Sequence, residues 1–258
     1  MNTFIIKLIL MPLVVATVTL ASRKWGNMVG GILASLPFVA GAILLFIAIE
    51  QGITFAVATI SGVMVGILGW MIFCIVYILV GQRFNAIIST LAGYLAYLCW
   101  GAIILRFIPL LSLPSWYVIT LTLGVIGLKY FPQVDTPEVE EHRKLHFEIP
   151  LRMLLITMFV VAITYFAHIL GSTWSGILTP FPIITAVLLI FTHFTQGIVQ
   201  VRTVIIGLFT GMFGFTTFLF LQAYFLPAIG IFYAFLWAFL IDIVITLLTR
   251  KILLRIVI

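Results

Sequence analysis

The sequence is poor in charge: Asp, Glu, Lys and Arg together make up 8% of its 258 residues. Soluble domains usually carry about a quarter charged residues, so this content excludes an ordinary water-soluble fold. Cysteine is equally scarce, since only Cys74 and Cys99 occur and both lie inside apolar runs. The sequence therefore implies neither a disulfide framework nor a thiolate metal site.

Short motifs of the common catalytic sites are also missing. The chain contains no Walker sequence, no His-Glu-x-x-His, no Cys-x-x-Cys pair and no Gly-x-Ser-x-Gly elbow, which argues against ATP-driven pumping and hydrolysis. No cluster of acid, histidine and nucleophile emerges either. We therefore expect a protein that is not an enzyme and that holds no cofactor and no metal ion.

Hydrophobic residues are abundant instead, at 64% of the chain with a mean hydropathy of +1.34. One membrane-spanning helix needs about 20 apolar residues, so the chain has room for about nine. The apolar runs predict an all-α, polytopic membrane protein. Its predicted transmembrane helices cover residues 3–21, 28–49, 53–80, 84–105, 113–131, 150–169, 175–195, 203–226 and 228–249.

Basic residues set the predicted orientation. With the N-terminus outside, all but two of the 13 Lys and Arg residues fall in cytoplasmic loops and the tail, and only Lys7 and Arg106 lie outside. This asymmetry follows the positive-inside rule and places the C-terminus in the cytoplasm. The net charge of +6 therefore indicates topology rather than nucleic-acid binding. We expect an integral protein of a bacterial inner membrane, in contact with the lipid bilayer.

One extended polar stretch, 132–149, separates the fifth and sixth predicted helices. His142 and His146 have the i, i+4 spacing that could hold a metal ion on a helix. No third ligand is obvious, so we interpret the stretch as a solvated cytoplasmic connector.

An internal repeat at a constant offset of 145 residues is the most informative pattern. Between residues 171 and 218 every glycine falls on a glycine of the first copy, and Pro182 falls on Pro37. The glycine pairs are 26 and 171, 31 and 176, 52 and 197, 62 and 207, 66 and 211, and 69 and 214. Since glycine matches are less frequent by chance than apolar matches in this composition, the sequence indicates an internal duplication.

The repeat divides the chain into repeat 1 (1–112), a linking helix (113–131), the cytoplasmic connector (132–149) and repeat 2 (150–258). Each repeat holds four predicted helices, and the single linking helix makes the second repeat enter the membrane from the opposite side. The sequence thus predicts a 4+1+4 arrangement of inverted-topology repeats. Such repeats are a common ground plan of secondary transporters.

The second repeat also resembles a known family. Ser175-Gly-Ile-Leu-Thr-Pro-Phe-Pro-Ile-Ile-Thr-Ala186, followed by Gln196-Gly197 and Arg202-Thr203, is similar to the small four-helix GlpM-type membrane proteins, and Gly31-Ile-Leu-Ala-Ser-Leu-Pro37 resembles a diverged copy. Because members are single units, the resemblance implies duplication and fusion through the fifth helix. The family's activity is undefined, so the resemblance supports the architecture and leaves the solute open.

Prolines mark matching places in the two repeats. Pro37 and Pro182 lack an N–H group and are predicted to free carbonyl groups near the middle of the membrane. Helices interrupted at corresponding positions point to a transport site, although kinks in packed helices would also explain the prolines. The predicted solute site, where the second and seventh helices meet, consists of Leu33, Ser35, Pro37, Leu178, Thr179, Pro180, Pro182 and Thr185.

Three ionisable residues are candidates for coupling transport to a proton or cation: Asp242, His193 and Glu50. An acid inside a span is costly unless it is paired, protonated or hydrated, so a functional role is the default hypothesis for Asp242. Its repeat counterpart is Tyr97. Each residue also has a structural alternative. Asp242 could be hydrogen-bonded within the bundle or reach cytoplasmic water, His193 could be a polar residue with satisfied hydrogen bonds, and Glu50 could lie at the membrane interface.

Two Gly-x-x-x-Gly steps occupy matching places in the third and eighth predicted helices. Small residues at this spacing let helix backbones approach closely. We therefore assign a packing role to Gly62, Gly66, Gly207 and Gly211.

Together these patterns predict a secondary transporter or permease for a small solute, with alternating access between the second and seventh helices and a proton or cation as the coupling ion. One alternative is a non-transporting scaffold subunit of a lipid or polysaccharide assembly, which the glycine packing faces would also suit. A passive channel is the other. The solute, the coupling ion and the oligomeric state are not encoded in any motif.

Overall fold

The structure, a computed structural model, describes residues 3–134 and 148–256. These residues form helices joined by short turns, and no strand occurs among them, which confirms the predicted all-α class. His142 and His146, considered above as metal ligands, lie outside the described residues.

The first half of the chain contains α1 (Thr3–Trp25), α2 (Asn27–Ser35), α3 (Phe38–Glu50), α4 (Ile53–Gly81) and α5 (Ala86–Ile104). A short 3₁₀ turn, η1 (Ile108–Leu110), precedes α6 (Leu113–Lys129). Polar side chains begin two of these helices: Asn85 accepts the Ile88 N–H at 3.0 Å, and Ser112 accepts the Ser115 N–H at 3.4 Å. These hydrogen bonds satisfy donors that a helix start leaves unpaired.

The second half contains α7 (Glu148–Leu178) and the long α8 (Ile183–Ile256). Both change direction at glycines with left-handed backbone angles, namely Gly171 in α7 and Gly197 and Gly230 in α8. Only glycine adopts these angles without strain. The glycines therefore divide α7 into 148–170 and 172–178, and α8 into 183–196, 198–229 and 231–256.

Several helices are long and apolar enough to cross a membrane. Within the described residues these are Asn27–Glu50, Ile53–Gly81, Ala86–Ile104, Ile149–Leu178 and Ile183–Ile252, the last of which turns twice. Shorter apolar helices cover Phe4–Thr17 and Leu113–Lys129. Their lengths and composition are those of a membrane protein.

The backbone repeats at the offset found in the sequence. Gly26 and Gly171 have φ of 85° and 72°, and Gly52 and Gly197 have φ of 90° and 82°. Each of these glycines separates one helix from the next, so the starts of α1 to α4 at residues 3, 27, 38 and 53 recur 145 residues later at 148, 172, 183 and 198. These two glycine matches thus correspond to similar turns.

Two predicted single helices are each broken into two. The run 28–49 is interrupted at Leu36 and Pro37 between α2 and α3, and the run 175–195 between Leu178 and Ile183. Leu36 is extended (φ −62°, ψ 148°), because a residue before proline avoids the helical region. Matching hydrogen bonds follow each break: Gly41 N–H donates to Pro37 O and Ala186 N–H to Pro182 O, both at 2.8 Å.

The halves contact each other reciprocally. Gly31 in α2 packs against the backbone of Val204 and Gly207, while its counterpart Gly176 packs against Thr59 and Gly62. Residues 59 and 62 are themselves the counterparts of 204 and 207. Contacts that exchange partners in this way are the mark of a two-fold axis.

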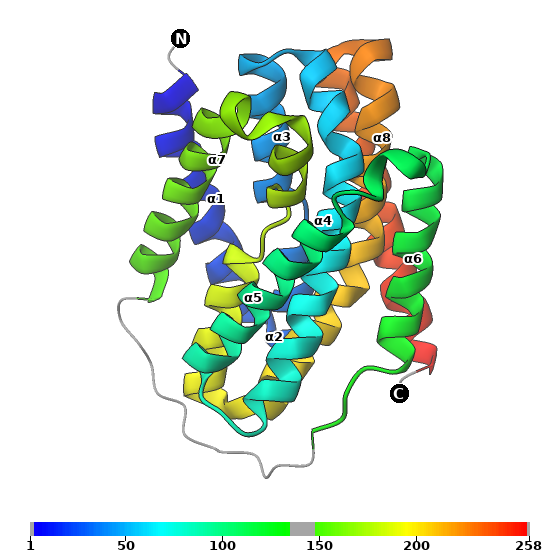
Figure 1. The fold of residues 1–258 in the computed structure, drawn as a ribbon. Helices are drawn as coiled ribbons and strands as arrows, with labels where there is room; N and C mark the ends of the chain where they lie inside the picture. The colour runs from blue at the N-terminus through cyan, green and yellow to red at the C-terminus, as the bar shows by residue number, and fades with distance from the viewer. Residues whose placement is uncertain (1–2, 135–147, 257–258) are drawn as a thin grey trace.

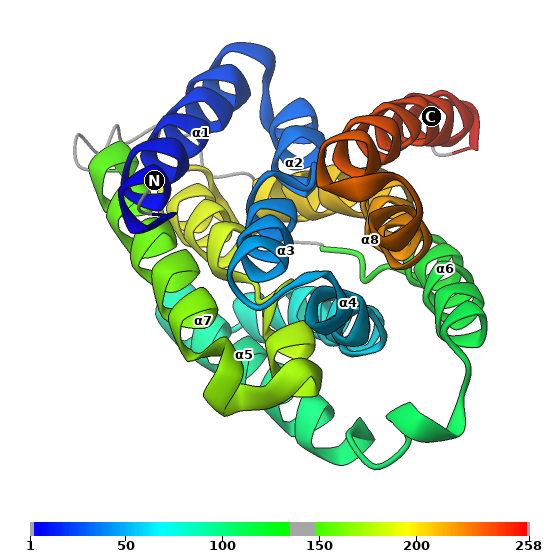
Figure 2. The same cartoon turned by 90° about the horizontal axis from the view of Figure 1, so that it is seen from above.

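Equivalent helices run in opposite directions along the long axis of the molecule. In Figure 1, α1 descends from the N-terminus at the top, whereas residues 148–170 of α7 ascend. Viewed from above in Figure 2, α1 and α7 lie side by side at one edge and α3 and α4 lie centrally. In Figure 1, α4 and α6 both end toward the bottom of the view. Arg83 follows the end of α4 by two residues, and Lys129 is the last residue of α6.

We expect Gly31→Ala and Gly176→Ala each to destabilise the protein by about 2 kcal/mol, as overpacking of a filled interface does. A methyl group on either glycine would overlap a backbone carbonyl oxygen, of Val204 or Thr59, which cannot rotate away. Gly101→Ala is the control, because its methyl group would meet no atom closer than a side-chain carbon at 3.3 Å. Thermal unfolding in detergent checks this, and equal stability of all three variants would contradict it.

Candidate functional site

The two helix breaks face each other across a cavity of about 70 Å³. Residues 34–36 and 39–40 line it from the α2–α3 break, and residues 179–181 and 183–185 from the α7–α8 break. Twelve of its 16 lining residues form six pairs at the offset of 145, including Ser35 with Pro180 and Trp70 with Phe215. The cavity therefore lies on the two-fold axis.

Hydroxyl groups provide most of the polarity of the cavity. Ser35 Oγ donates to Ile32 O at 2.6 Å and Thr179 Oγ1 to Ser175 O at 2.7 Å. Thr185 Oγ1 accepts the indole N–H of Trp70 at 2.9 Å. Each hydroxyl oxygen keeps lone-pair capacity, and none of the lining residues is charged. A volume of a few water molecules suits a small, uncharged solute or a dehydrated cation.

Four of the eight residues predicted for the solute site line the cavity: Ser35, Thr179, Pro180 and Thr185. The other four, Leu33, Pro37, Leu178 and Pro182, belong to the same breaks but are not among the lining residues. Pro37 instead borders a separate apolar groove beside α1.

The prediction that the prolines free carbonyl groups is wrong. Leu33 O accepts the Leu36 N–H at 3.3 Å and Leu178 O accepts the Phe181 N–H at 3.1 Å, while the Thr179 N–H reaches Gly176 O at 3.1 Å. Each helix tightens into a 3₁₀-like turn before its break. In such a turn, the N–H group three residues later donates to the carbonyl oxygen that would otherwise be unpaired. The side chains, rather than open carbonyl groups, thus define the cavity.

Asp242 belongs to the 231–256 segment of α8 and is not among the residues that line the cavity. It is fully buried, so it does not reach water at the helix end. Its Oδ1 accepts from Thr246 Oγ1 at 3.4 Å, and within the described part of the chain its Oδ2 has no hydrogen-bond partner. The carboxyl group packs on Gly214, one helical turn beyond Gly211, which packs on Ser35. Asp242 and the C-terminal end of α2 are therefore about one turn apart.

The equivalent position in the first half is filled differently. Tyr97, the counterpart of Asp242, packs on Gly69, and its hydroxyl donates to Ile177 O at the end of 172–178. The shorter Asp242 has no such bond to Ile32 O, which Ser35 occupies. Near-symmetric backbones thus carry an acid on one side and a tyrosine on the other.

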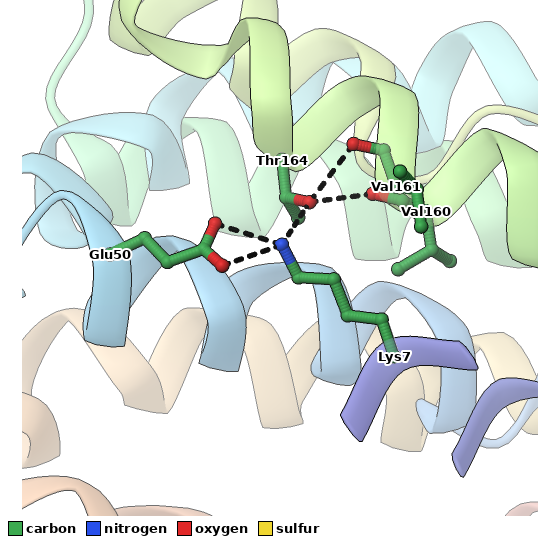
Figure 3. A network of polar contacts seen from close by, with 5 residues as sticks. All are labelled: Lys7, Glu50, Val160, Val161 and Thr164. Atoms are coloured by element: carbon green, nitrogen blue, oxygen red, sulfur yellow. Dashed lines mark hydrogen bonds and ion pairs between the residues drawn. The ribbon is translucent and has the colours of Figure 1, made fainter. Parts of the chain in front are cut away.

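His193 and Glu50 lie away from the cavity. His193 Nδ1 is 3.3 Å from the Tyr77 hydroxyl. Glu50 pairs with Lys7, whose Nζ lies 2.7 and 2.8 Å from the two carboxylate oxygens and donates to Thr164 Oγ1 at 2.6 Å (Figure 3). The sequence argument missed Lys7, although a lone lysine in the first apolar run and a lone glutamate ending the second are the signal for such a pair.

The two breaks also differ in their surroundings. The Phe181 ring stacks on Tyr94 with centroids 4.9 Å apart, packs against Phe159 at 5.4 Å and meets the edge of Tyr97 at 5.1 Å. Leu36 holds the equivalent place in the other break and has no ring to stack. Beside that break an apolar groove of about 610 Å³ opens between α1, α3 and residues 231–239.

Comparison of the chain with models of protein families, with curated proteins and with solved structures gives no match.

Proposed function

We propose that this protein is a small secondary transporter of a bacterial inner membrane, with nine spans in a 4+1+4 arrangement of inverted repeats derived from a four-helix unit. The N-terminus lies outside and the C-terminus in the cytoplasm. Support comes from the opposite course of equivalent helices (Figure 1) and from the unequal distribution of Lys and Arg among the predicted loops. Inverted repeats with broken helices at the midplane are typical of secondary transporters.

The observation that carries this proposal is the cavity on the two-fold axis between the breaks. Pro37 is ten residues beyond Asn27, about 15 Å along a helix, which places the break near the middle of a bilayer. Backbone irregularity at that depth is tolerated where it is buried in protein or lines a wet cavity. The solute would bind there to the hydroxyl groups of Ser35, Thr179 and Thr185.

The unequal packing of the breaks supports alternating access. One break is covered by the rings around Phe181, whereas the other borders an apolar groove. Because the backbone is nearly symmetric, each break could adopt the packing that the other now has. Such an exchange would present the cavity to the opposite side of the membrane. Polar contacts join the two halves toward each end of the bundle: Lys7 donates to Thr164 at one end, and Asn27 donates to Gln196 at 2.6 Å at the other.

Asp242 is the group that we assign to ion coupling. The C-terminal end of a helix carries partial negative charge, so a carboxylate one turn from the end of α2 is favoured when it holds a proton or a cation. The Ser35 hydroxyl, which lines the cavity, lies between the solute site in the cavity and the Asp242 carboxyl group. Binding of a proton or cation at Asp242 can therefore influence binding of the solute.

Cysteine accessibility tests the proposal without knowledge of the solute. In a chain with Cys74 and Cys99 replaced, we expect Ala40→Cys to react with a membrane-impermeant maleimide added to either side of a vesicle, because Ala40 lines the cavity. Ile43→Cys, one turn further along α3 and fully buried, should react from neither side.

The outcome also separates the transporter from the other functions considered. Reaction of Ala40→Cys from both sides together with ion conductance would indicate a passive channel. Protection from both sides, with no uptake of any metabolite tested in proteoliposomes, would overturn the transporter proposal and favour a scaffold subunit.

A further inference from the structure

A second and larger groove runs between α6 and the 231–256 segment of α8. Its volume is about 980 Å³, and the two helices stand at the right in Figure 1. Leu121, Val125 and Leu128 form one wall at helical spacing, and Ile245, Thr249 and Ile252 form the other. Each wall is formed by residues along one face of its helix. The groove is therefore elongated and mainly apolar, and it follows the side of the protein.

The two ends of the groove differ in charge. Lys129 and Arg202 line it at the end where α6 finishes, while Tyr117 and Thr217, hydrogen-bonded to each other at 2.9 Å, line the other end. Arg202 Nε donates to Pro132 O at 2.9 Å, which fixes the guanidinium group. Among the described residues neither base has an acidic partner. The basic end therefore offers donors suited to an oxyanion.

The length of the groove matches one leaflet. Tyr117 and Lys129 are 12 positions apart, which corresponds to about 18 Å along a helix, close to half the thickness of a bilayer. With the placement in the membrane proposed above, Lys129 and Arg202 lie at the cytoplasmic surface and Tyr117 near the midplane.

We propose that this groove binds an anionic phospholipid of the cytoplasmic leaflet. Its phosphate group contacts Arg202 and Lys129, and an acyl chain follows the α6 stripe toward Tyr117. The groove continues from Lys129 and Arg202 between apolar walls, which an acyl chain can cover and a free phosphate ion cannot. The ligand is therefore a lipid. The inference rests on the placement in the membrane and is independent of transport.

Native mass spectrometry of the intact protein in neutral detergent tests this site. We expect phosphatidylglycerol to be retained in a 1:1 complex at least tenfold more than phosphatidylcholine with the same acyl chains. Arg202→Gln and Lys129→Gln should each weaken phosphatidylglycerol retention about fivefold, the factor that corresponds to about 1 kcal/mol per basic residue. Arg83→Gln is the matched control, since Arg83 is an exposed base at the same end outside the groove.

Three results would overturn the proposal: equal retention of the two lipids, an unchanged complex in the double variant, or displacement of phosphatidylglycerol by millimolar inorganic phosphate, which would indicate a site for the free anion. Thermal unfolding of each variant separates loss of the site from loss of the fold. Because Tyr117 lies at the far end, Tyr117→Phe should leave the preference for the anionic headgroup intact.

Discussion

Asp242→Asn is expected to abolish ion-driven accumulation of the solute while leaving exchange intact. Asparagine keeps the size of the side chain but cannot carry a proton or balance a cation. Asp242 is fully buried, with one weak bond to Thr246 at 3.4 Å, so little in the fold depends on its charge. In proteoliposomes, uptake driven by a pH or sodium gradient should fall at least tenfold, and counterflow with solute on both sides should persist.

Tyr97→Phe is the matched control for this experiment, because residue 97 holds the same place in the other half. It removes the hydroxyl bond to Ile177 O and no ionisable carboxyl group, so gradient-driven uptake should continue. If Asp242→Asn accumulates solute as well as the parent does, Asp242 is structural and coupling must lie elsewhere.

Removal of one member of the Lys7–Glu50 pair is expected to have the largest effect on stability. Lys7 is 4% exposed, and its ammonium group contacts both Glu50 oxygens and Thr164 (Figure 3). The ammonium group also lies over the face of the Phe46 ring. Lys7→Met leaves the Glu50 carboxylate without its partner, and an orphaned charge of this kind costs about 3 kcal/mol. Thermal unfolding in detergent measures the loss.

A double variant identifies the cause of that loss. Lys7→Met with Glu50→Met removes both charges and should recover most of the stability, because two apolar side chains of similar size need no mutual partner. Lys24→Met, at an exposed lysine, should change stability by less than about 0.5 kcal/mol. A double variant as unstable as the single one would show that packing, rather than the unpaired charge, is responsible.

Much of the fold could be predicted from the sequence because the physical signals are local. A run of about 20 apolar residues has few structures available other than a helix, and the turns at Gly26, Gly52, Gly171 and Gly197 need the one residue that accepts left-handed angles. At Pro37 the sequence predicts an interrupted helix, with a kink in a packed helix as the alternative. The extended geometry and 3₁₀-like hydrogen bonds of this break depend on neighbouring side chains, and the predicted free carbonyl groups were therefore wrong.

The composition alone determined that this is an apolar, all-helical chain, and the sequence also carries the glycine pattern that recurs at an offset of 145 residues. Tertiary structure decided which residues meet: Ser35, Thr179 and Thr185 around one cavity, Asp242 a turn behind it, and Lys7 against Glu50 and Thr164. These contacts join residues as far as 157 positions apart. Periodicity reports which face of a helix is apolar, but the partner of each face is fixed only when whole helices pack together.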